Sequence, residues 1–367
     1  MSFNTNKLVI AVSLVLSGFF AFELYTQLPA EEKLAAPVNS QQVSNSKILF
    51  GSSADQNAPQ PIWTAINREA PDVFLFLGDN IYGDTESSEV FQQEYGKLSA
   101  KQGFQTLRKN TDIVATWNDH DYGVIDGGVD YPAKELSRQV MLDFWEEPKD
   151  SQRRSRDWGI YKTSYIGTED QRVQIIMLDT RWNRTPLIAL VKDEYRAKRG
   201  IFNKGFFVPS EDPQATILGE QQWQRLEQDL KQPADLRIIA SSIQVFSYFT
   251  GFESWANFPR EQTRLLELIK TTEANNILFI SGDTGWGELS KVTDKSGNSL
   301  FELTSSGLTH VVEKPSSNQN RVQGPYSGQN YGFIEIDWQA PGRPVLFGVR
   351  DVEGRTQFSQ QMFIDDN

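Results

Sequence analysis

The segments FGSSADQ (50–56), FLFLGDNIYGDT (74–85), ATWNDHDYG (115–123) and ILFISGD (277–283) decide the fold of this chain. Each begins with apolar residues that are typical of a buried strand and ends in small, acidic or amide residues. In α/β folds, ligands bind at the carboxyl ends of the strands. Four such strand ends in one chain therefore predict a carboxylate-rich metal site that is assembled from distant segments.

The rest of the chain alternates in the same way, and its apolar patterns predict both strands and helices. We expect strands at 47–51, 72–77, 112–117, 173–178, 236–243 and 276–281, and helices at 61–70, 88–110, 132–146, 218–231 and 259–271. The C-terminal part changes character and predicts antiparallel strands at 300–307, 331–338, 344–350 and 357–364. We interpret 292–299 as a hairpin turn and 313–330 as a long exposed loop that could rim a pocket. The sum predicts a mixed α/β sandwich in one domain, with helices outside and sheets inside.

Composition and charge limit the classes of function. The chain has 367 residues, of which 38% are hydrophobic and 12% aromatic, so it is long and apolar enough for a sizeable core. A net charge of −12 argues against nucleic acid as a partner, because phosphate backbones recruit basic patches. A phosphorylated small substrate remains compatible if metal ions supply the local positive charge. Cys is absent, which excludes disulfides and thiolate ligands.

The N-terminus predicts export. Lys7 precedes an uncharged apolar run at 8–22, which is shorter than the roughly 20 residues of a membrane span and typical of a secretory signal. We expect residues 1–28 to be a signal peptide, with an uncleaved anchor formed by 8–22 as the alternative. The polar stretch 29–46 is interpreted as a linker, and 47–367 as the folded domain. The mature protein is expected in the periplasm or outside the cell, with membrane contact only through this N-terminal segment.

Several acidic residues and one histidine stand out as candidates for chemistry. Asp79 ends the apolar run FLFLG, and its carboxylate could bridge two hard cations, although GDN is also good turn chemistry. His120 lies between two carboxylates at a strand end, a setting that tunes a general acid, with a hydrogen-bonded structural role as the alternative. Asp283 and Asp55 also follow apolar runs. His310 could be a rim ligand or a hydrogen-bonded strand residue.

Taken together, these motifs resemble the PhoD-like (alkaline phosphatase D) branch of the metallophosphoesterases. The resemblance covers roughly 47–365 and is specific because many motifs occur in the same order. Besides the segments quoted above, it rests on YPAKE (131–135), RRSRDWGIY (153–161), LDTRWNR (178–184), ILGEQQW (217–223), IIASSIQV (238–245), WANFPRE (255–261) and ELTSSGLTH (302–310).

The resemblance implies a four-layer αββα sandwich with mixed sheets and a centre of two or more metal ions that hydrolyses phosphate esters. By position, the implied metal ligands are Asp55, Asp79, Asp119 and Asp283, with Asp79 bridging. His120 would be the acid that protonates the leaving group, or it would orient phosphate. Asn80, Arg181 and Arg184 are the implied substrate-binding residues, with a supporting role as the alternative for the two arginines. Ca, Mn or Mg are the implied ions.

Three positions depart from the family pattern. Ser53 stands where a Cys is usual, which disfavours Fe(III), because a hydroxyl is a poor ligand for that ion. Asn118 replaces the first Asp of WDDHD. Gly285 stands where a His is expected after SGD, so metal use or activity is expected to be altered. We expect the space beside Asp283 at this point to be open, filled by water or covered by Trp286, and we expect Gly285→His to raise metal affinity or turnover.

The sequence thus predicts an exported metal-dependent phosphatase or phosphodiesterase that acts on a small phosphate ester by metal-assisted attack of water on phosphorus. The alternative is a degenerate relative that binds phosphate or a phosphorylated ligand without turnover. A surface-associated structural domain on the same scaffold is a third interpretation. Four aromatic residues could form an apolar wall for the alcohol portion of the substrate or simply pack in the core: Tyr82, Trp117, Trp286 and Tyr326.

Overall fold

The computed structural model describes residues 43–192, 194–195, 204–293 and 297–365. The predicted signal or anchor at 1–28 and nearly all of the linker at 29–46 lie outside these ranges. Within them, no helix is both long and apolar enough to cross a membrane.

The first sheet has the strand order β15-β14-β13-β1-β2-β3. Its parallel strands are β1 (Asn45–Gly51), β2 (Val73–Leu77) and β3 (Asp112–Thr116). The C-terminal strands β13 (Asn330–Asp337), β14 (Pro344–Asp351) and β15 (Thr356–Phe363) continue it in antiparallel pairing. All five residues of β2, VFLFL, are buried, as expected of a parallel strand that is covered on both faces.

The second sheet has the order β12-β10-β11-β9-β8-β5-β4. Its members are β4 (Lys162–Ile166), β5 (Val173–Met177), β8 (Leu236–Ser241), β9 (Ile277–Ser281), β10 (Gly287–Thr293), β11 (Ser299–Ser305) and β12 (Arg321–Tyr326). Strands β5, β8, β9 and β11 are parallel, and β4, β10 and β12 pair in antiparallel fashion. A separate two-stranded sheet joins β6 (Ile188–Ala189) and β7 (Phe207–Val208).

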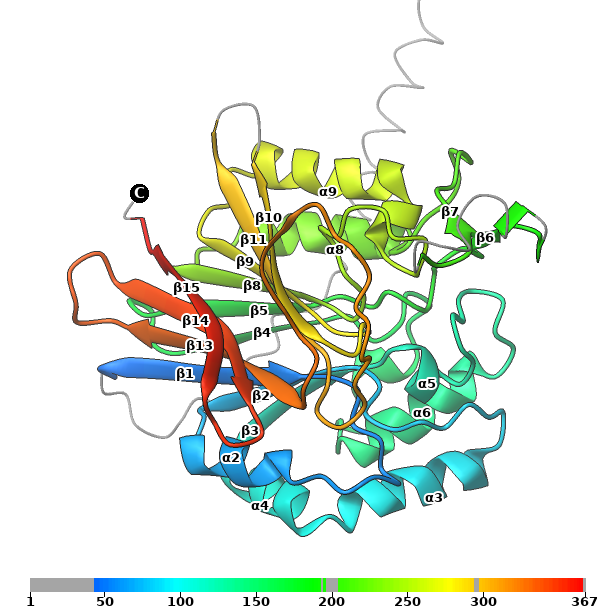
Figure 1. The fold of residues 1–367 in the computed structure, drawn as a ribbon, viewed down its shortest axis with the longest axis horizontal. Helices are drawn as coiled ribbons and strands as arrows, with labels where there is room; N and C mark the ends of the chain where they lie inside the picture. Colours follow the sequence, from blue (N-terminus) through cyan, green and yellow to red (C-terminus); the bar gives the residue numbers. More distant parts are fainter. Residues whose placement is uncertain (1–42, 193, 196–203, 294–296, 366–367) are drawn as a thin grey trace, which may run out of the picture. The chain divides into compact units, whose positions relative to one another are not determined.

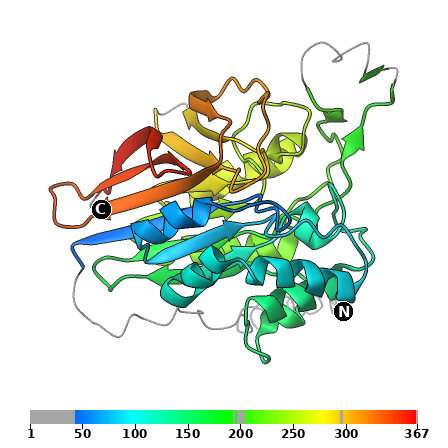
Figure 2. The ribbon, with the colours of Figure 1, turned by 60° about the horizontal axis from the view of Figure 1, so that its bottom comes forward.

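Helices cover the outer face of each sheet, while the inner faces pack on each other (Figures 1 and 2). On the first sheet these are α2 (Ile62–Glu69), α3 (Ser88–Ser99), α4 (Gln102–Asn110) and α6 (Lys134–Phe144), with the short α5 (Asp119–Tyr122) after β3. The second sheet carries α8 (Glu220–Leu230) and α9 (Pro259–Thr271). Two 3₁₀ turns, η1 (Gln152–Arg154) and η2 (Trp255–Asn257), complete the elements. A central core, which includes Leu75, Ile238 and Phe347, joins the two sheets, so the predicted αββα sandwich is confirmed.

Three details of the sequence prediction were wrong. The single helix expected at 88–110 is two helices, because Lys101 adopts an extended conformation, and the apolar positions Phe104 and Leu107 are out of phase with Leu98. The loop expected at 313–330 contains β12, which pairs with β10, a strand that the sequence analysis also missed. The run at 300–307 is antiparallel only to β10 and lies parallel to β9.

Candidate metal centre

Three strands end in the same sharp turn at the carboxyl edge of the sheets. Two residues after β1, β2 and β9, the backbone adopts a positive φ, at Ser53 (63°), Asp79 (50°) and Asp283 (72°). Non-glycine residues rarely take this left-handed conformation, and they keep it where the surrounding structure enforces it. The repeated turn stops each strand abruptly and leaves a polar side chain at the point where the two sheets meet.

These turns bring three of the four predicted carboxylates together. One carboxylate oxygen from each of Asp79, Asp119 and Asp283 lies within 4.8 Å of the others. Asp119 reaches the group from the first residue of α5, directly after β3. Asp55 is not among them: it is half-buried, and its Oδ1 accepts a hydrogen bond from the Asn57 amide at 2.8 Å. The convergence predicted for Asp79, Asp119 and Asp283 is thus present, without Asp55.

Asn118 lies among the three carboxylates, although the sequence analysis noted it only as a replacement of the first Asp of WDDHD. Its Nδ2 donates to Asp283 at 2.7 Å, to Asp119 at 3.1 Å and to Asp79 Oδ2 at 3.2 Å. Its Oδ1 accepts hydrogen bonds from the Arg181 guanidinium, which fixes the orientation of the amide. The amide therefore supplies weak positive potential to the cluster and relays that of Arg181.

The carboxylates still carry more negative charge than their neighbours balance. Burial, together with the charge of Asp119, raises the pKa of Asp79 well above its usual range. The same two causes raise the pKa of Asp283 to about 8. Burial also acts against the charge on Asp119, but Arg181 and His120 outweigh it and hold the pKa of Asp119 below its usual value. Repulsion among buried carboxylates is the condition that a bound cation relieves.

The donor set fits a hard divalent cation. Among the described residues, Asp79 Oδ1 is buried and has no hydrogen-bond partner, although its neighbours include two further carboxylates. Carboxylate oxygens are the preferred ligands of Ca²⁺, Mg²⁺ and Mn²⁺. A second acidic group joins Asp119 to Asp126 and Glu253. There Glu253 already pairs with two guanidiniums, from Arg181 at 2.7 Å and Arg184 at 2.9 Å. The first group is therefore the better cation site.

His120 lies at the rim of this cluster in a form suited to donating a proton. Asp84 Oδ2 lies 2.8 Å from His120 Nδ1, and the Tyr82 ring packs 4.2 Å from the imidazole. Burial lowers the pKa of His120, but the hydrogen bond to Asp84 and the nearby carboxylates outweigh it and raise the pKa to about 9. His310 also packs near Tyr82, with 5.8 Å between the two ring centroids. Both histidines of the chain therefore lie next to the same tyrosine.

Asp121 stabilises the site through the hydrogen bonds that its carboxylate accepts, a role that the sequence analysis did not predict. Its carboxylate accepts hydrogen bonds from the backbone amides of Asp79, Asn80 and Asn118, and from Asn80 Nδ2. The Asn80 side chain also donates to the Thr116 carbonyl at 2.8 Å and is fully buried. Asn80 therefore fastens the β2 and β3 turns together, and the structure gives it no open face toward a substrate.

The two arginines predicted to bind substrate are enclosed in the same way. Arg181 and Arg184 are fully buried, and both pair with Glu253. Arg181 also holds Asn118, while Arg184 donates to the carbonyls of Asp126 and Thr185. In this arrangement they position residues of the cluster, and direct contact of either guanidinium with phosphate stays an untested prediction.

The space expected beside Asp283 is present as a cavity that Asp283 and Trp286 line, but the Gly285 position itself does not accommodate a side chain. Its φ is +78°, a conformation that side chains disfavour, and a Cβ built there would lie 2.6 Å from Val312 Cγ2. The Val312 amide donates to the Gly285 carbonyl at 2.9 Å, and Ser306 Oγ accepts from the Gly285 amide at 2.9 Å. Ser53, at the other departure from the family pattern, hydrogen-bonds to the same Ser306 hydroxyl at 2.8 Å. The two substitutions are therefore joined in one packed unit.

Comparisons with known proteins agree with this architecture. A solved structure described as PhoD is similar, with a TM-score of 0.66 and 16% identity over 91% of this chain and 71% of that one. Another, described as GAP50, the anchor in the inner membrane complex of Plasmodium, has a TM-score of 0.54 and 12% identity over 88% of this chain and 90% of that one. At these identities the likeness is one of fold.

No curated protein matches the chain. The model of the PhoD-like phosphatase family matches residues 132–334, more than half of the 367 residues. The chain therefore belongs to the PhoD-like phosphatase family.

Proposed function

We propose that this protein is an exported, metal-dependent phosphoric ester hydrolase whose centre is the cluster of Asp79, Asp119 and Asp283. The observation that carries the proposal is the convergence of these carboxylates within 4.8 Å, with a buried Asp79 oxygen that lacks a partner among the described residues. Family membership supports the reaction class. Export rests on the apolar run at 8–22, and the substrate is expected to be a small phosphate ester.

The residues around the cluster suit attack of water on phosphorus with departure of an alcohol. A divalent cation, when bound, would supply positive charge that offsets the phosphoryl oxygens and favours deprotonation of the attacking water. Asp79, Asp119 and Asp283 would hold it. Because Asp84 engages Nδ1 of His120, the other ring nitrogen, Nε2, is left to donate a proton to the leaving alkoxide. Asp121 and Arg181 hold this arrangement in place through Asn80 and Asn118.

The test is turnover of p-nitrophenyl phosphate and bis-p-nitrophenyl phosphate after chelation and separate addition of Mn²⁺, Ca²⁺ and Mg²⁺. We expect cation-dependent hydrolysis that falls about 100-fold in His120→Ala, as for loss of a general acid. The matched control is Asp112→Asn, at the opposite end of β3 from Asp119 and exposed. A wild-type rate equal to that of His120→Ala with every cation would contradict the proposal.

A second function, ligand binding without turnover, is favoured by one specific observation. The Asn118 amide donates to all three carboxylates and so provides part of the compensation that a cation would give. One fold can host functions other than catalysis. GAP50, which has a similar fold, is described as an anchor. Phosphate binding measured by calorimetry, together with absence of hydrolysis under all cations, would favour this second function.

A further inference from the structure

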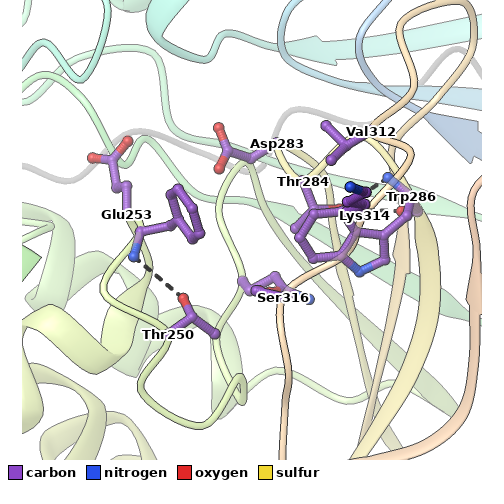
Figure 3. A pocket seen from close by; sticks show the side chains of 10 residues that line it. Thr250, Glu253, Asp283, Thr284, Trp286, Val312, Lys314 and Ser316 are labelled. Carbon is purple, nitrogen blue, oxygen red and sulfur yellow. Dashed lines mark hydrogen bonds between the residues drawn. The ribbon is translucent and has the colours of Figure 1, made fainter. Parts of the chain in front are cut away.

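A cavity of about 190 Å³ opens directly beside the carboxylate cluster. Asp283 belongs to both, so whatever fills the cavity lies next to the proposed centre. Figure 3 shows the carboxylates of Glu253 and Asp283 on one side and Trp286, Val312 and Lys314 on the other. The cavity thus has an acidic end that faces the cluster and a largely apolar opposite wall.

The apolar wall is built rigidly. Trp286 is almost fully buried, and its Nε1 donates to Glu288 at 2.7 Å, which fixes the indole. Val312 is tied to Gly285 by a backbone hydrogen bond and by close packing. Because these walls are held by buried contacts, they form a preorganised surface that keeps its shape without a ligand.

Phe252 lies at the more open side of the cavity. Its side chain is 44% exposed, so a large apolar ring is left partly in water at the edge of a concave surface. Its backbone amide donates to Thr250 Oγ1 at 3.3 Å, and both residues line the cavity. An exposed ring beside a preformed apolar wall gains surface burial when an apolar ligand group enters between them.

We propose that this cavity binds the aromatic or short aliphatic alcohol group of a phosphate ester, with Phe252 and Trp286 as the residues that set specificity. The inference rests on the proposed function, because it places the phosphoryl group of the same substrate at Asp79, Asp119 and Asp283. An apolar cavity of about 150 Å³ holds one benzene ring. A space of about 190 Å³ therefore takes a single ring or a short chain.

This orientation depends on the cation at the proposed centre, because Glu253 and Asp283 alone would repel a phosphoryl group. Lys314 is the one cationic residue among those that line the cavity, and it lies on the wall opposite the carboxylates. A substrate that is anionic at one end and apolar at the other would place its phosphoryl group toward the proposed cation and its apolar group against Trp286.

The experiment compares binding of phenylphosphonate and methylphosphonate, which cannot be hydrolysed as esters, to the full-length chain in Mn²⁺ by calorimetry. We expect phenylphosphonate to bind about 10- to 100-fold more tightly, the range for apolar groups in a fitted pocket. Phe252→Ala should remove most of this preference. Tyr248→Ala is the matched control, because Tyr248 is a 48% exposed aromatic residue nearby in the chain that does not line the cavity.

Equal affinity for the two phosphonates, binding of neither, or an unchanged preference in Phe252→Ala would overturn the inference. Melting curves establish that both variants fold. Rates with phenyl phosphate and methyl phosphate separate this inference from the proposed function. If the protein hydrolyses both esters equally well, the cavity assignment fails and the function stands. If phenylphosphonate is preferred but no ester is hydrolysed, the cavity assignment stands and the hydrolase assignment fails.

Discussion

Buried acids in two regions of this molecule have opposite surroundings. On α9, Glu261 is buried and accepts hydrogen bonds from Thr216 Oγ1, the Ile217 amide and Trp223 Nε1, at 2.7 to 3.0 Å. At the carboxyl edge of β2, Asp79 is equally buried, yet one of its oxygens has no partner among the described residues and two further carboxylates lie close by. Burial alone therefore does not distinguish the two sites.

The difference lies in the supply of donors. A buried carboxylate that its own fold satisfies contributes to a fixed structure, whereas one that is left short of donors costs free energy until a ligand arrives. Glu288 follows the first pattern, with Trp286 Nε1 and Asn318 Nδ2 each at 2.7 Å and an ion pair to Arg321. The Asp79 cluster follows the second. The comparison teaches that the acids of the proposed metal centre differ from the structural acids in their unbalanced charge.

The largest expected effect is on catalysis, from Asp79→Asn. We expect turnover to fall about 1,000-fold, because a neutral amide cannot hold a cation as a carboxylate does. In chelator, the same variant should melt at or above the wild-type temperature, since a buried, poorly compensated charge is removed. Paired rate and melting measurements provide the check. A clearly lower melting temperature in chelator would show that Asp79 is satisfied by its own fold.

The opposite result is expected at the satisfied site. Glu261→Gln should lower the free energy of unfolding by about 3 kcal/mol, because an amide nitrogen would then face several hydrogen-bond donors. It should leave the cation requirement unchanged. Urea unfolding measures the effect, and the exposed Glu267→Gln on the same helix is the control. Loss of less than about 0.5 kcal/mol, the level of an ordinary surface change, would remove the contrast between the two regions.

A third prediction concerns the loop that follows Asp283. Gly285→His should destabilise the protein by about 2 kcal/mol through overpacking against Val312, without a gain of activity. Gly297→His is the control that separates steric clash from backbone strain. Gly297 also has a positive φ, +90°, but a Cβ added there would meet no atom within 4 Å among the described residues. Increased turnover in Gly285→His would restore the lost-histidine interpretation.

The smallest expected effect is the dependence of melting on pH and cations. The pKa of Asp283 rises on folding to about 8, so in chelator its contribution to stability is fully present below its unfolded pKa and is lost as pH rises toward 8. We expect the melting temperature to fall by a few degrees, roughly, between pH 5 and 8. Added Mn²⁺ should reverse much of this fall, and Asp283→Asn should reduce it. Equal pH slopes in wild type and Asp283→Asn would contradict the assignment.

The sequence by itself determined the fold class and most of the strand ends. The apolar runs VFLFL and ILFIS form buried strands, and the acidic residues that follow them fall at the edge where parallel strands end. This local pattern was enough to predict that Asp79, Asp119 and Asp283 would meet, but it also included Asp55, which lies outside the cluster. It also placed His120 beside them, because that residue lies in α5, the short helix after β3.

Only the tertiary structure decided which residues position the carboxylate cluster through hydrogen bonds and ion pairs. Asn118 reaches Asp283 across 165 positions of the chain, and Glu253 reaches Arg181 across 72. No local pattern encodes such pairings, because they arise when separate strand ends are brought to one edge. The backbone conformation of Gly285, and the cavity between Phe252 and Trp286, likewise depend on contacts between segments that the sequence leaves far apart.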